Sequence, residues 1–161
     1  MVNIPWRGRL RQLALLGFFL IVAVCITYPL ITVWSTHFAG HPFSDSYEIA
    51  RHIWWINHAL KTGQPLFFQP LLLFPQGMPS VYFWGNPLQL FPAWLFAFVI
   101  PLPAAYNTQI LLTLVLNGWA MFALARHLTG SAPAALIAGA VYMAFPTMQG
   151  HLAAGHVGLL A

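Results

Sequence analysis

Long stretches of this chain carry no charged side chain, and apolar residues fill most of them. The charge-free stretches are 12–44, 62–125 and 127–161. Within the first, the apolar run from Leu13 to Trp34 is long enough for a helix across a hydrocarbon core of about 30 Å, which takes about 20 residues. The pattern predicts a first membrane helix over about Gln12 to Trp34. The run exceeds the core of about 7–15 residues of a signal peptide, so we expect the helix to be retained.

The pattern changes after this helix. Residues 35–86 mix polar and apolar positions and are predicted to lie outside the membrane. From Asp45 to about Lys61, apolar residues recur every three or four positions, which is typical of a helix with one apolar face. Trp54 and Trp55 are interfacial aromatics, so we expect this helix to lie along the membrane surface. Leu66 to Trp84 is interrupted by proline and glycine and predicts a partly buried loop.

Two further apolar helices are predicted, from Ala104 to about Ala125 and from about Ala132 to Phe145. The intervening Pro87–Leu102 is short and contains Pro92, so it is either a tilted span or a re-entrant hairpin, and we favour a crossing. The sequence thus predicts an all-α polytopic membrane protein with about four spans. Its regions are 1–34 (tail and first helix), 35–86 (outer loop with the interfacial helix) and 87–161 (further spans).

Composition supports the membrane class. The chain is 60% hydrophobic and 5% charged, against roughly 25% charged residues in ordinary globular domains. Basic residues cluster at Arg7, Arg9 and Arg11, which indicates an orientation signal or an anionic-lipid contact. We expect a multi-pass protein of the inner (plasma) membrane with a cytoplasmic N-terminus, and no nucleic-acid binding. Cys25 is the only cysteine, which excludes an internal disulfide.

The orientation contains one conflict. If Pro87–Leu102 crosses the membrane, Arg126 and His127 lie on the outer side, against the positive-inside tendency; if it does not cross, they lie in the cytoplasm.

The chain ends within an apolar stretch. We therefore expect it to be the front of a longer protein or a short subunit.

The only two carboxylate side chains, Asp45 and Glu48, stand three positions apart at the start of the predicted interfacial helix. This spacing suits a general base with a supporting acid, or two oxygen ligands for a divalent cation. The spacing alone favours a capping box, in which the two side chains bind backbone N–H groups. The roles are compatible, because a carboxylate at a helix N-terminus is held rigid and ionised.

Other polar residues are candidates for binding. His41 with Asp45 can supply a metal site, although the spacing fits no standard zinc pattern; no other cofactor is indicated. Arg51, His52 and Lys61 are candidates for a phosphate or lipid headgroup, the alternative being solvated side chains. The C-terminal histidines are interpreted as helix-end residues rather than haem ligands; they are His127, His151 and His156.

Several short motifs occur in an ordered series, after one cytoplasm-anchored helix. They are Ser44-Asp45-Ser46-Tyr47-Glu48, Leu73-Phe74-Pro75-Gln76-Gly77, Ala105-Tyr106-Asn107 and Ala125-Arg126-His127-Leu128-Thr129-Gly130, the last followed by an Ala-rich helix ending near Phe145-Pro146. In this order the chain resembles the N-terminal part of bacterial polytopic membrane glycosyltransferases of the GT-C superfamily, which use polyprenyl-phosphate-linked sugars.

The resemblance implies inverting or retaining sugar transfer at the outer membrane face. It assigns Asp45 as base or metal ligand, with Glu48 as the second acid. It implies membrane lipid and a polyprenyl-phosphate sugar as partners. Many relatives carry another acid in a later outer loop, whereas residues 129–131 offer none.

Two other function classes fit the same pattern. A non-catalytic small transmembrane subunit, packed against other membrane subunits, would explain the length and the missing acid. A lipid or solute transporter module is less consistent, because no paired charges occur within the predicted spans.

Overall fold

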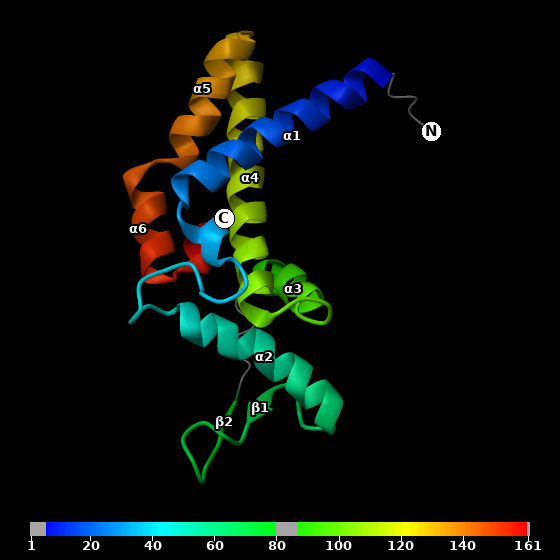
Figure 1. Ribbon diagram of the computed structural model, residues 1–161, viewed down its shortest axis with the longest axis vertical. Helices are drawn as coiled ribbons and strands as arrows, with labels where there is room; N and C mark the ends of the chain where they lie inside the picture. The colour runs from blue at the N-terminus through cyan, green and yellow to red at the C-terminus, as the bar shows by residue number, and fades with distance from the viewer. Residues whose placement is uncertain (1–5, 80–86, 161) are drawn as a thin grey trace.

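The computed structural model describes residues 6–79 and 87–160, which are mostly helical (Figure 1). The elements are α1 (Trp6–Ile26), the 3₁₀ helix η1 (Leu30–Val33), α2 (Ser46–Thr62), β1 (Phe68–Gln69), β2 (Met78–Pro79), α3 (Pro87–Phe96), α4 (Leu102–Thr129), α5 (Ala132–Met143), α6 (Pro146–Ala154) and the 3₁₀ helix η3 (Val157–Leu159). The described residues fit the predicted all-α class. Their only strands pair antiparallel over two residues each, with Phe68 opposite Pro79 and Gln69 opposite Met78.

The first helix ends earlier than predicted. It stops at Ile26, and the chain turns at Pro29 into η1 instead of continuing to Trp34. Proline has no backbone N–H for the helical hydrogen-bond ladder, and the Thr27 hydroxyl donates to the Ala23 carbonyl at 2.8 Å in the last turn. Residues 30–39 are therefore available to fold back against α4.

Helices α4 and α5 form a tight antiparallel hairpin. Gly130 ends α4 with a φ of +67°, and its N–H donates to the Arg126 carbonyl. The helices then approach closely, because a Cβ built on Gly139 would lie 2.6 Å from the Gly118 carbonyl oxygen and from the Phe19 ring. Small residues thus bring α1, α4 and α5 together.

Helix α1 crosses α4 obliquely and runs in the opposite direction (Figure 1). Near its start, Arg11 lines the same groove as Arg126 at the end of α4. Beyond its end, the Trp34 carbonyl accepts a hydrogen bond from Asn107 near the start of α4. The basic ends of the two helices consequently lie at one end of the molecule.

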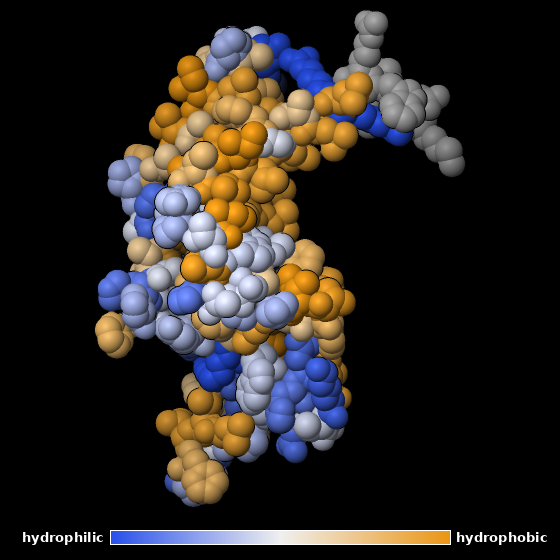
Figure 2. Space-filling model, viewed as in Figure 1, coloured by the Kyte–Doolittle hydropathy of each residue, from blue (hydrophilic) through white to orange (hydrophobic). Residues whose placement is uncertain are grey.

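Within residues 6–79 and 87–160, two helical segments are long and apolar enough to cross a membrane, Gly8–Ile26 and Leu102–Thr129. Only 11% of the first and 39% of the second is buried inside the molecule, whereas the core helix of a soluble protein is mostly buried. Figure 2 shows apolar residues covering the part of the surface formed by these helices. Helix α3 has 10 residues, which span about 15 Å, half of a hydrocarbon core.

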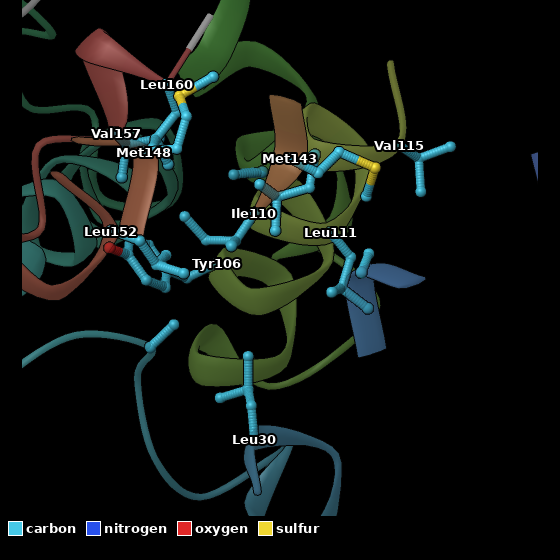
Figure 3. Close-up of a cluster of buried hydrophobic side chains, with 14 of the residues drawn as sticks. Leu30, Tyr106, Ile110, Leu111, Val115, Met143, Met148, Leu152, Val157 and Leu160 are labelled. Atoms are coloured by element: carbon cyan, nitrogen blue, oxygen red, sulfur yellow. The ribbon is translucent and has the colours of Figure 1, made fainter. Parts of the chain in front are cut away.

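A cluster of buried side chains joins the C-terminal segment to α4 (Figure 3). The labelled members come from η1, α4, the end of α5, α6, η3 and the residue after it: Leu30, Tyr106, Ile110, Leu111, Val115, Met143, Met148, Leu152, Val157 and Leu160. Asn117 on α4 also donates a side-chain hydrogen bond to the Leu160 carbonyl. This core fixes α6 and η3 beside the start of α2.

Candidate functional site

Asp45 lies directly before α2 but does not cap it. Its side chain makes no capping hydrogen bond, so the predicted capping box is wrong. The backbone is helical at Asp45, with φ −68° and ψ −1°, whereas a capping side chain needs the extended conformation to reach the N–H two or three residues on. The Ser44 hydroxyl accepts from the Ser46 N–H instead, at 3.4 Å.

The Asp45 carboxylate pairs with a histidine from the far end of the chain. Asp45 Oδ2 lies 3.2 Å from His156 Nε2, and the two side chains are 59% and 42% exposed. His156 Nδ1 lies 3.3 Å from His151 Nδ1. If Nε2–H of His156 donates to the carboxylate, its Nδ1 accepts from His151, which assigns one tautomer to each ring.

The backbone holds this arrangement in place. The Asp45 N–H donates to the Ala154 carbonyl at 3.0 Å, and the His41 N–H donates to the Ala153 carbonyl at 2.7 Å. Gly155 allows the close approach, since a Cβ there would lie 2.3 Å from the Ser46 nitrogen. The sequence did not reveal His156 as a partner of Asp45, because nothing in local spacing connects residues so far apart.

An open groove of about 460 Å³ borders the same turn. Its lining is mostly apolar and comes from three segments: Ile26–Leu30 with Val33, Phe38–Pro42, and Gln149, Leu152 and Ala153. Its end at Gly40, His41 and Pro42 leads directly into the loop that carries Asp45. The exposed carboxylate therefore stands near a hollow lined by apolar residues.

Beneath the exposed pair lies a buried polar layer. Ser46 donates to the Ala39 carbonyl at 2.8 Å and accepts from the hydroxyls of Ser44 at 2.8 Å and Tyr106 at 3.1 Å. These bonds tie the start of α2 to α4 and to the preceding loop. Tyr106, the central residue of the Ala105-Tyr106-Asn107 motif, thus helps to position the start of α2.

The other predicted acid belongs to a separate cluster on α2. Glu48 Oε1 lies 3.8 Å from Arg51 and from His52 Nε2. Arg51 donates to the side-chain oxygen of Gln69 on β1, and Gln69 Nε2 lies 3.3 Å from His52 Nδ1. Arg51 Nη2 also lies 3.4 Å from His52 Nε2, so N–H donors face both ring nitrogens of His52.

Burial, and secondarily the Arg51 charge, lowers the pKa of His52 to about 4. Burial also lowers the pKa of Arg51, while Glu48 acts in the opposite direction. His52 is therefore neutral at physiological pH. Arg51 and His52 hold the β1 loop on α2, and that engagement competes with the headgroup contact predicted for them.

Two predicted site residues remain, Lys61 and His41. Lys61 is exposed in the last turn of α2, about 24 Å along the helix axis from Asp45. The exposed His41 lines the groove, and its Nδ1 accepts from the Phe43 N–H at 3.4 Å. Across 6–79 and 87–160, no three His, Cys, Asp or Glu side chains are grouped to hold a metal ion. The metal site stays a prediction.

The structure thus brings together Asp45 with His156 and His151, and separately Glu48 with Arg51 and His52. Neither a protein-family model, nor a curated protein, nor a solved structure matches this chain.

Proposed function

We propose that the chain is a membrane-embedded module of a sugar transferase that uses a polyprenyl-phosphate-linked sugar at the outer membrane face. Asp45 acts in it as the general base. One observation carries this proposal: the Asp45 carboxylate is 59% exposed, is held by His156 and is not used by its own helix. The apolar groove at the neighbouring turn is the second support, because a prenyl chain needs such a surface.

The exposed apolar helices support membrane placement. With the N-terminal arginines in the cytoplasm, the groove that Arg11 and Arg126 share favours a cytoplasmic position for Arg126 as well. Residues 30–101 then stay at the outer face, with α2 at the interface, and α5 with α6 returns the chain to that face. This proposal has three crossing segments rather than four and removes the conflict with the positive-inside tendency.

The proposed reaction needs a base at the depth where lipid meets water. The acceptor hydroxyl gives its proton to Asp45 while its oxygen forms a bond to the anomeric carbon of the sugar. The bond from that carbon to the phosphate oxygen breaks, and its electron pair leaves with the polyprenyl phosphate. His156 holds Oδ2 of Asp45 through the 3.2 Å contact, which directs Oδ1 to the acceptor.

Asp45→Asn tests the base. Purified protein in lipid vesicles is given polyprenyl-phosphate sugars, and release of sugar to water is measured, so that no acceptor need be known. We expect the rate to fall about 10²- to 10⁴-fold, because Asn keeps the shape and accepts from His156 but cannot take the proton. Asn also leaves the helix start unchanged, since Asp45 makes no capping bond.

His58→Gln is the matched control, because His58 is on the same helix and stacks on Trp54 at a ring distance of 4.8 Å. We expect it to keep the wild-type rate. Equal rates for wild type and Asp45→Asn would remove Asp45 from the base role. The chain would then be interpreted as a non-catalytic subunit. Stoichiometric copurification with other membrane proteins would test that interpretation.

A further inference from the structure

A second groove lies away from Asp45, between α1, α4 and α5. Its volume is about 550 Å³. Apolar side chains form most of its wall, and two arginines from different helices, Arg11 and Arg126, line it too. We propose that this groove binds an anionic phospholipid, whose phosphate is held by the two guanidinium groups while an acyl chain covers the apolar wall.

The charges of the chain leave these arginines without an internal counter-ion. The only acidic side chains are Asp45 and Glu48, and they pair with His156 and with the Arg51 and His52 cluster. Among the described residues, no carboxylate pairs with Arg11 or Arg126. Two cations on one apolar groove attract an anion from outside the chain.

Arginine geometry favours a phosphate as that anion. Arg126 uses one N–H to donate to the Gly130 carbonyl, which leaves the other guanidinium donors for a ligand. A guanidinium binds phosphate oxygens with two parallel N–H groups. Arg11 is exposed and Arg126 is half-buried, so both reach the rim of the groove.

The wall distinguishes a lipid from a soluble phosphate. Phe18 and Trp119 are 37% and 42% exposed, and Leu15, Phe122 and Leu136 continue the apolar surface. Figure 2 shows hydrophilic atoms near the start of α1 beside the apolar surface of the helices. The anionic headgroup of a phospholipid matches the two arginines, and its hydrocarbon chain matches the apolar wall. This inference rests on the proposed membrane placement and is independent of sugar transfer.

Quenching of Trp119 fluorescence tests the site. The whole chain is reconstituted in phosphatidylcholine vesicles with rising fractions of phosphatidylglycerol brominated on its acyl chains. The difference in emission between wild type and Trp119→Phe is the fluorescence of Trp119 itself, and its quenching reports lipid in the groove. We expect brominated phosphatidylglycerol to quench this emission at lower mole fractions than brominated phosphatidylcholine. Arg11→Gln and Arg126→Gln should each raise the half-quenching mole fraction about fivefold, since each arginine contributes about 1 kcal/mol toward anionic lipid.

Arg9→Gln is the matched control, because it removes one charge from the same helix at an exposed residue that does not line the groove. We expect it to behave as wild type. The proposal is overturned if Arg9→Gln shifts the curve as much as Arg11→Gln, if the two lipids quench equally, or if glycerol 3-phosphate displaces the lipid.

Flotation separates a failure of this site from a failure of membrane placement. A membrane-embedded chain floats with pure phosphatidylcholine vesicles whether or not Arg11 and Arg126 are present. If the wild-type chain floats but phosphatidylglycerol and phosphatidylcholine quench it equally, the site alone is rejected. Failure to float would reject membrane placement and the site together.

Discussion

Single polar side chains fix the loop between η1 and α2. Asn107 accepts from the Ala39 N–H at 2.9 Å and donates to the carbonyls of Trp34 and His37 at 2.8 Å each. It is fully buried, and burying an amide is favourable only when its hydrogen bonds are made. Asn107 therefore fixes the loop that leads from η1 to Asp45.

His52 gives a prediction for stability against pH. Its pKa is lowered to about 4 in the folded protein, against about 6.5 in an unfolded chain. Between these values the unfolded state binds more protons, so the free energy of unfolding falls as pH falls from about 6.5 to about 4. The expected loss is about 3 kcal/mol, measured by denaturation in detergent at pH 7.5 and pH 4.

The variant His52→Gln isolates this effect from other titrations, because Gln has no proton to take up in this range. We expect wild type to lose more stability than His52→Gln on acidification. The groups that face His52 include Glu48 and Arg51 on its own helix and Gln69 on β1. An identical pH slope for wild type and His52→Gln would show that the folded protein accommodates the charged ring.

At the level of elements, the close contact between α4 and α5 depends on glycine, which has no side chain. The Cβ of an alanine at 139 would lie 2.6 Å from the backbone oxygen of Gly118, which can move only with α4 itself. We expect Gly139→Ala to destabilise the protein by about 1–3 kcal/mol, as other overpacked sites do. Thermal denaturation in detergent measures this cost.

Gly17→Ala is the control within α1, because a Cβ there meets nothing within 4 Å. Alanine favours a helix over glycine by about 1 kcal/mol, so this variant should be neutral or more stable. Equal melting temperatures for Gly139→Ala and Gly17→Ala would mean that α4 and α5 do not pack as closely as described.

For the whole molecule, the direction of α4 relative to α1 decides the sidedness of every later segment. We predict that residues 62–65 and residue 127 lie on opposite sides of the membrane. In a Cys25→Ser background, Gln64→Cys should react with a membrane-impermeant maleimide in intact cells. His127→Cys should react only after permeabilisation, because it is exposed at the end of α4 that the proposed placement puts in the cytoplasm.

Labelling of His127→Cys in intact cells would contradict the three-crossing arrangement. It would mean that 87–102 crosses the membrane after all, as the sequence pattern alone had favoured. The ten helical residues of α3 make that outcome unexpected, since about 20 are needed to cross.

The sequence by itself determined the all-α class of the fold and most of its helical segments. Charge-free apolar runs, prolines and glycines act locally, so they predicted the helices within 104–125 and 132–145 and the end of the interfacial helix near Lys61. They also singled out Asp45 and Glu48 as the only carboxylates. These properties depend on residue type and spacing along one stretch of chain.

Only the tertiary structure decided which partner each polar side chain contacts. It paired Asp45 with His156 instead of with its own helix, turned the chain back after Ile26, and brought Arg11 to the groove of Arg126. Those contacts join segments that are far apart in sequence. They follow from how the helices pack against one another, and helical periodicity carries no information about the partner.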